Sequence, residues 1–112
     1  MTSDNFNKLT PAETERLSML AEECAEVIQV VGKILRHGYE SSNPTIPREH
    51  GVFIPTNYGD LIKELGDIRG VVYGMVQARD LPSDFFERYD MEATWQKKLK
   101  WTHHQDKTDA GS

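Results

Sequence analysis

The feature that most constrains the fold is a helix signal that runs without interruption from Thr10 to Gly38. Pro11 follows Thr10 directly and Glu13 comes three residues after Thr10, which is the pattern of a capping box with proline in the first turn. Gly38 is the residue type that most often ends a helix. A helix this long needs neighbours to cover it, so we expect an all-α helical bundle.

Two runs of the sequence repeat apolar residues with a helical period. At about 100° per residue, the first run places its apolar residues in one stripe, which we interpret as a core face. This stripe consists of Leu17, Leu20, Cys24, Val27, Ile28, Val31 and Leu35. A second run, from Asn57 to about Arg79, has a similar stripe of Leu61, Leu65, Ile68, Val72 and Met75. We therefore expect two long antiparallel helices with a shared core, and we expect Gly66, Gly70 and Gly74 to admit another helix at close range.

Acidic residues stand beside both stripes at matching angles. Glu23 and Glu26 lie roughly 100° and 160° from the centre of the first stripe, and Glu64 and Asp67 lie on the same side of the second stripe, with the same angle between them. Neither Glu23 nor Glu26 has a Lys or Arg three or four residues away, so their charges are not neutralised within the helix. Helices packed side by side would bring all four carboxylates towards one point.

Carboxylates alone are hard oxygen ligands, which suit Mg²⁺, with Mn²⁺ as the alternative, better than zinc. Mg²⁺ held in this way usually completes its shell with water and substrate phosphates, so a nucleotide is the natural ligand. A di-iron bundle needs Glu-x-x-His, whereas Glu26 is followed by Gln29 and Glu64 by Asp67. A solvated acidic face on an ordinary bundle is the competing interpretation.

The remaining sequence indicates a single domain over residues 1–112. Residues 1–9 form a lead-in, residues 10–101 the helical core with a loop at 38–56, and residues 102–112 a tail expected to be disordered. Within the core, residues 84–101 are predicted to form a C-terminal helix, kinked or split near Asp90, that closes the site.

Composition excludes several function classes. The net charge is −5 and the basic residues form no dense run, so no nucleic-acid partner is expected. The sequence has neither a signal-peptide pattern nor about 18 consecutive apolar residues, so we expect no membrane association. Cys24 is the single cysteine and lies in the apolar stripe, which favours a reduced thiol in the core and a cytoplasmic location.

The acidic motifs also resemble those of a known family. Glu22-Glu23-x-x-Glu26 followed by Glu64-Leu65-Gly66-Asp67 resembles the EExxE…ExxD signature of the MazG-like, all-α nucleoside triphosphate pyrophosphohydrolases, over about residues 10–101. The resemblance implies a helical bundle completed as a homodimer or higher homo-oligomer. It also implies hydrolysis of ribo- or deoxynucleoside triphosphates to the monophosphate and pyrophosphate, by a metal-activated water with Mg²⁺.

The resemblance assigns roles to individual residues. It makes Glu23, Glu26, Glu64 and Asp67 the metal ligands, and Glu22 or Glu26 the base that accepts the proton of the attacking water. Lys33, Gln96, Lys97 and Lys98 are the candidates for substrate binding. The alternative is a non-catalytic helical module with the same fold that binds a nucleotide or a protein.

Overall fold

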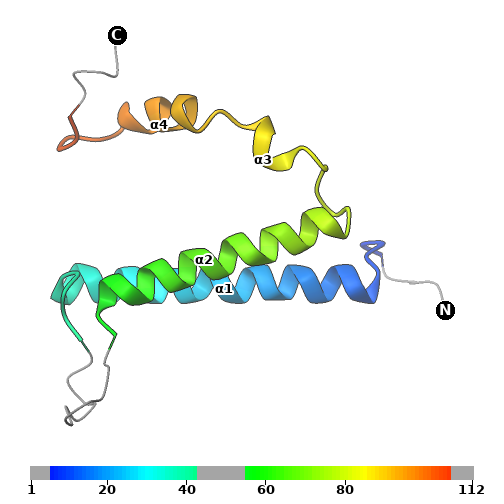
Figure 1. Ribbon diagram of the computed structural model, residues 1–112, viewed down its shortest axis with the longest axis horizontal. Coiled ribbons are helices and arrows are strands. Elements are labelled where there is room, and N and C mark those ends of the chain that lie inside the picture. Colours follow the sequence, from blue (N-terminus) through cyan, green and yellow to red (C-terminus); the bar gives the residue numbers. More distant parts are fainter. Residues whose placement is uncertain (1–5, 43–54, 107–112) are drawn as a thin grey trace.

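Two long helices that pack together form the centre of the structure (Figure 1). They are α1, Pro11–His37, and α2, Asn57–Gln77. The computed structural model describes residues 6–42 and 55–106, and the regular structure in these residues is helical apart from an isolated antiparallel bridge between Ser42 and Thr56. The expectation of an all-α chain with two long helices packed together is thus confirmed for the described residues.

The ends of α1 are where the sequence predicts them. The Thr10 hydroxyl accepts a hydrogen bond from the Glu13 amide at 3.1 Å, and the Glu13 carboxylate accepts one from the Thr10 amide at 2.8 Å. Gly38 ends the helix with a φ of 89°, and its amide donates to the Ile34 carbonyl at 2.7 Å. Local capping chemistry therefore fixes both ends of this helix.

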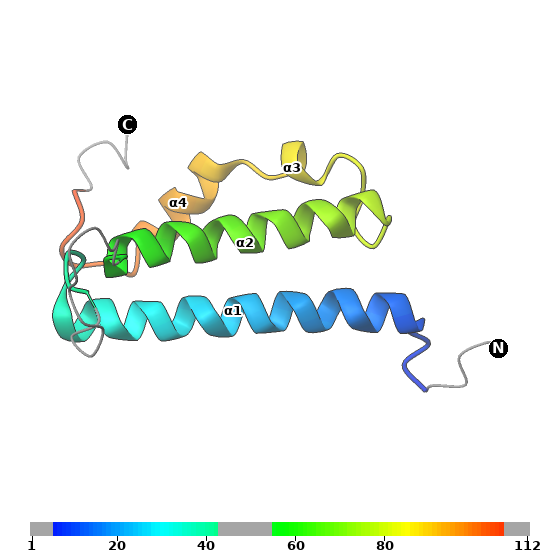
Figure 2. The same cartoon turned by 60° about the horizontal axis from the view of Figure 1, so that its bottom comes forward.

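Polar contacts at both ends hold α1 and α2 antiparallel. The buried Asn57 side chain donates to the Gly38 carbonyl at 3.1 Å, which ties the end of α1 to the start of α2. At the other end, the Arg16 guanidinium donates two hydrogen bonds to the Asp80 carboxylate, at 2.5 and 2.9 Å. These hydrogen bonds hold the pKa of Asp80 below its ordinary value. Figure 2 shows the two helices running side by side along the length of α2.

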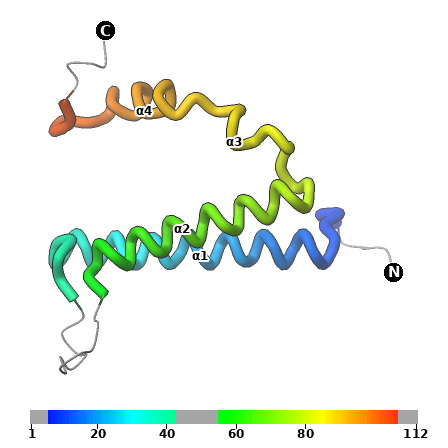
Figure 3. The backbone as a smooth tube through the Cα atoms, viewed as in Figure 1, coloured from blue at the N-terminus to red at the C-terminus, as the bar shows by residue number. Residues whose placement is uncertain are grey.

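The predicted C-terminal helix is split into two. Phe85–Arg88 forms the short α3 and Met91–Leu99 forms α4, and the Asp90 side chain caps α4 by accepting from the Ala93 amide at 3.0 Å. The backbone leaves the end of α2 and carries α3 and α4 away from the α1–α2 pair (Figure 3). The expectation that this segment closes the site is therefore wrong for the single chain. We call residues 85–99 the C-terminal arm.

The face of α1 that meets α2 coincides only in part with the predicted apolar stripe, of which Leu20 and Val27 are half-buried. Val30 is buried on the contact side, whereas Ile28 and Leu35 of the stripe are 72% and 82% exposed. Cys24, predicted to be a core thiol, is also exposed. The reason is geometric, because one neighbouring helix covers only one sector of α1 and α2 occupies the sector that carries Glu23 and Val30.

The glycines of α2 do not admit another helix in the single chain. A Cβ atom added at Gly66, Gly70 or Gly74 would meet nothing within 4 Å. The prediction of close helix packing at these positions is therefore wrong for this chain, since each glycine borders open space rather than a neighbouring backbone.

The molecule is extended. Its radius of gyration is 19.0 Å, compared with about 13 Å for a compact domain of this length. No helix in the described part of the chain is apolar enough over a sufficient length to cross a bilayer. Most of the predicted loop, the first half of the lead-in and the end of the predicted tail lie outside the described residues, at positions 43–54, 1–5 and 107–112.

Candidate metal centre

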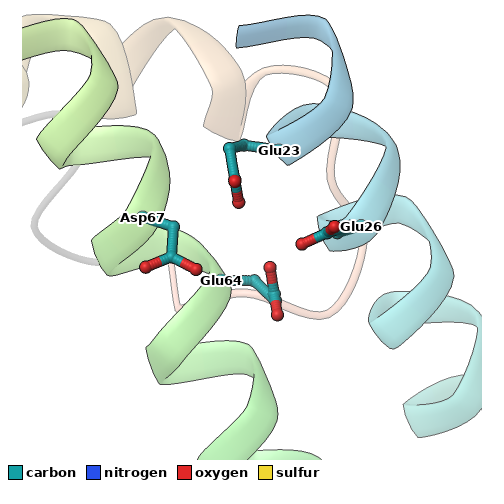
Figure 4. A group of neighbouring side chains, drawn as sticks. All are labelled: Glu23, Glu26, Glu64 and Asp67. Carbon is teal, nitrogen blue, oxygen red and sulfur yellow. The ribbon is translucent and has the colours of Figure 1, made fainter. Parts of the chain in front are cut away.

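Four carboxylates from the two long helices meet near the middle of the α1–α2 pair (Figure 4). Glu23 and Glu26 project from α1, and Glu64 and Asp67 project from α2. Each residue offers one oxygen, and these four oxygens lie within 4.8 Å of one another. We call these residues the carboxylate cluster. They are the four positions predicted as metal ligands.

The spacing within each helix explains why the cluster forms. Residues three apart lie on neighbouring turns of the same face, so each helix presents two carboxylates together. Glu26 is offset from Glu23, and Asp67 from Glu64, in the same rotational sense. In an antiparallel pair of helices, equal offsets in the same sense point to the same side of the pair. Glu26 and Asp67 therefore lie on one side, which we call the acidic side.

The cluster contains buried oxygen atoms that lack hydrogen bonds. Glu23 Oε2 and Glu64 Oε2 are buried without a hydrogen-bond partner among the described residues. A buried carboxylate oxygen is costly to leave unpaired, because it has lost water and gained nothing in return. Both atoms lie between the two helices, so the space between Glu23 and Glu64 is suited to a cation.

Crowding of like charges shifts the acidity of the cluster. The pKa of Glu26 is raised to about 7, first by a hydrogen bond with Glu64 and then by the charges of Glu23 and Glu64. The pKa of Glu23 is raised mainly because burial disfavours its charged form, and also by the charges of Asp67 and Glu64. Partial protonation of Glu26 therefore reduces the repulsion among the four carboxylates, as a bound cation would.

One cation is already present at the edge of the cluster. The Lys63 ammonium lies 2.9 Å from Asp67 Oδ2 and 3.4 Å from Glu64 Oε1, and these contacts raise the pKa of Lys63 above its ordinary value. The site residues predicted from the sequence do not include Lys63. Its position next to Glu64 and four residues before Asp67 was the signal that it reaches both carboxylates.

The donor set suits Mg²⁺ or Mn²⁺. All four side chains supply hard oxygen atoms, and two of those atoms are buried and unpaired. Zinc usually takes histidine or cysteine, and the described residues place neither type in the cluster. The residues present therefore fit a hard divalent cation, which Glu23, Glu26, Glu64 and Asp67 would hold.

The other predicted site residues lie at different distances from this centre. Glu22 is exposed beside Glu23 on α1. Lys33 is seven residues after Glu26, which places it on the same side of α1 about 10 Å further along the axis. Gln96, Lys97 and Lys98 belong to α4, which stands apart from α1 and α2 in Figure 1. The single chain therefore does not bring these three residues to the carboxylates.

Gln96 nevertheless has an unpaired atom. Its amide nitrogen donates to the Glu92 carboxylate at 3.2 Å, while its carbonyl oxygen is buried without a partner among the described residues. Lys97 and Lys98 are exposed on the same helix. All three substrate-binding assignments on the arm therefore stay predictions.

Comparison of the chain with known proteins gives no match to a family model, a curated protein or a solved structure. The features of this chain that bear on its function are therefore the carboxylate cluster, the charges around it and the acidic motifs of the sequence.

Proposed function

We propose that the chain is a Mg²⁺-dependent nucleoside triphosphate pyrophosphohydrolase, which converts a ribo- or deoxynucleoside triphosphate to the monophosphate and pyrophosphate. The observation that carries the proposal is the convergence of four carboxylate oxygens from two helices, two of them buried and unpaired. The resemblance to the MazG-like signature adds the substrate class. Glu23, Glu26, Glu64 and Asp67 would hold the metal.

When bound, Mg²⁺ supplies the positive charge that polarises the phosphoryl oxygens of the substrate and increases the acidity of water. The chain itself supplies a group that accepts a proton. Glu26 is the first candidate, because its carboxylate belongs to the cluster that would hold the metal. Glu22 is the second candidate, because it is exposed next to the cluster and is available as a base.

Lysines supply charge for the phosphates. Lys33 shares the acidic side of α1 with Glu26, and Lys63 already lies against Glu64 and Asp67. Gln96, Lys97 and Lys98 join the site only if α4 of one copy approaches the carboxylates of another. This requirement agrees with the homodimer or higher homo-oligomer that the resemblance implies.

The second candidate is a non-catalytic helical module that binds a nucleotide or a protein. The observation in its favour is Lys63, which partly neutralises Glu64 and Asp67 without any metal. Under this interpretation the cluster is an internally paired acidic surface. Mg²⁺ would then have little effect on the protein, and no nucleotide would be hydrolysed.

The deciding experiment is an incubation with Mg²⁺ and a panel of ribo- and deoxynucleoside triphosphates, with the products separated by ion-exchange chromatography. We expect monophosphate and pyrophosphate from the wild type, and no product above background from Glu64→Gln or Glu26→Gln. Glu15→Gln is the matched control, because Glu15 is an exposed acid on α1 outside the cluster. It should retain wild-type activity.

The outcomes separate the two candidates. Monophosphate without pyrophosphate would indicate stepwise phosphate release and a different hydrolase. No turnover of any nucleotide by the folded protein would favour the binding module. Activity unchanged in Glu64→Gln would remove the carboxylate cluster from the mechanism.

A further inference from the structure

Lys63 contacts both carboxylates that α2 contributes to the cluster. Its ammonium lies 2.9 Å from Asp67 Oδ2 and 3.4 Å from Glu64 Oε1. Among the described residues, no other lysine or arginine forms an ion pair with a cluster carboxylate. A lysine ammonium is charged at neutral pH. The chain therefore places one positive charge of its own at the edge of the cluster.

The helical position of Lys63 does not account for both contacts. Residues adjacent in sequence do not face each other on a helix, so Lys63 reaches Glu64 only because its side chain turns towards the cluster. A lysine four residues before an acid is also the less favourable order for an ion pair within a helix. The ammonium thus bridges oxygens of two carboxylates, as a cation in the cluster would.

The spacing of the cluster oxygens suits one metal ion. The four oxygens lie within 4.8 Å of one another. Ligand oxygens lie about 2.1 Å from Mg²⁺, so opposite ligands of one ion are about 4.2 Å apart. In sites with two ions the metals are about 3.5–4 Å apart. A second ion would have to share these carboxylates, and Lys63 already engages one oxygen on two of them.

The balance of charge leads to the same number of ions. The four carboxylates carry four negative charges when all are ionised. One divalent ion together with Lys63 balances three of these charges, so a second ion would make the centre positive. Without Lys63, two divalent ions would balance all four. The charge of Lys63 therefore decides between one bound ion and two.

We infer that Lys63 takes the place of a second divalent ion, so that the cluster of the nucleotide-free chain binds one Mg²⁺ or Mn²⁺. The inference rests on the metal centre of the proposed function, but it concerns metal binding alone. The competing interpretation is an ordinary surface ion pair, because the Lys63 side chain is 66% exposed and such pairs contribute little. Under that interpretation, loss of Lys63 would leave the number of ions unchanged.

The test is equilibrium dialysis of the full chain against Mn²⁺ without nucleotide, followed by measurement of the bound metal. We expect one Mn²⁺ per chain in the wild type and two in Lys63→Gln. Lys63→Arg keeps the positive charge and should bind one.

Arg69→Gln is the matched control, because Arg69 is exposed on α2 and its loss changes the net charge by the same amount as Lys63→Gln. Arg69 is two residues after Asp67 and so lies about 200° around the helix from it, away from the cluster. This variant should bind one Mn²⁺.

Electron paramagnetic resonance of the bound Mn²⁺ gives a second measurement. A single Mn²⁺ shows a resolved hyperfine pattern, whereas two ions about 3.5–4 Å apart are magnetically coupled and lose it. We expect the resolved pattern in the wild type and the coupled, broadened signal in Lys63→Gln. Circular dichroism should show that both proteins retain their helices.

Three results would overturn the inference and leave the metal centre in place. The first is two ions in the wild type. The second is one ion in Lys63→Gln, which would make Lys63 an ordinary surface ion pair. The third is two ions in Arg69→Gln as well, which would assign the effect to net charge.

Two other results separate this inference from the proposed function. Absence of bound Mn²⁺ from the wild type would overturn both, because no metal centre would then exist in the native chain. The expected ion numbers in a protein that hydrolyses no nucleotide would contradict the proposed function and support the role of Lys63.

Discussion

Binding of Mg²⁺ to the carboxylate cluster should release protons, and the pKa of Glu26 gives the number expected per bound ion. The pKa of Glu26 is about 7, so about half of the molecules carry a proton there at pH 7. The metal binds the deprotonated form. We therefore expect about half a proton to be released per bound ion at pH 7, and almost none at pH 8.5, where Glu26 is already ionised.

The assay is isothermal titration calorimetry of Mg²⁺ into the protein, in two buffers that differ in their enthalpy of ionisation. The difference in observed heat between the buffers gives the number of protons released. In Glu26→Gln the release at pH 7 should disappear and binding should weaken. Glu15→Gln is the control, because Glu15 is an exposed acid on α1 outside the cluster, and it should retain the release.

Two results would refute this reasoning. If the heat at pH 7 does not depend on the buffer although Mg²⁺ binds, Glu26 is not protonated and the crowding of charge inferred for the cluster is wrong. If the release is equal at pH 7 and pH 8.5, the proton comes from another group. Absence of any binding heat in either buffer would argue against the metal centre itself.

Three further predictions concern stability. With EDTA present, the free energy of unfolding should fall as pH rises from about 4.5 to 7, because the folded chain holds a proton on Glu26 that the unfolded chain has lost. Mg²⁺ should remove this pH dependence. Urea unfolding midpoints measured across the range test it, and a free energy of unfolding that rises with pH would contradict it. Gly70→Ala should stabilise the protein by about 0.5–1 kcal/mol in thermal melts, because the added methyl meets nothing within 4 Å, and a loss would show that another helix packs there. Met75→Ala, which empties a buried position between the helices, should cost about 2–5 kcal/mol in urea unfolding, whereas the exposed Gln77→Ala should change little.

Much of the local structure was predictable because its causes are local. The capping box of Thr10 and Glu13 and the glycine at position 38 set the ends of α1 through contacts within four residues. The break at Asp90 was also visible, since its side chain caps α4. The grouping of Glu23, Glu26, Glu64 and Asp67 followed from equal angular offsets on two helices. Periodicity is sufficient to predict such a grouping once two helices are assumed to be antiparallel.

The sequence did not reveal which face of α1 would be buried. The pattern predicts that the most apolar stripe, centred near Cys24 and Ile28, is the core face, yet α2 packs against the sector that contains Glu23 and Val30. An apolar helix face predicts that the face will be buried, but it does not identify the element that buries it. In a short chain the covering surface need not belong to the same molecule.

By itself, then, the sequence determined where the long helices begin and end and that each carries a pair of acids on one face, because both properties depend on residues close together along the chain. The tertiary structure decided that the acidic faces meet, that Lys63 reaches two of the carboxylates, and that Arg16 pairs with Asp80. It also left Ile28 and Leu35 of the predicted apolar stripe exposed. These contacts join residues up to 64 positions apart, and their geometry depends on how whole helices are placed rather than on any local pattern.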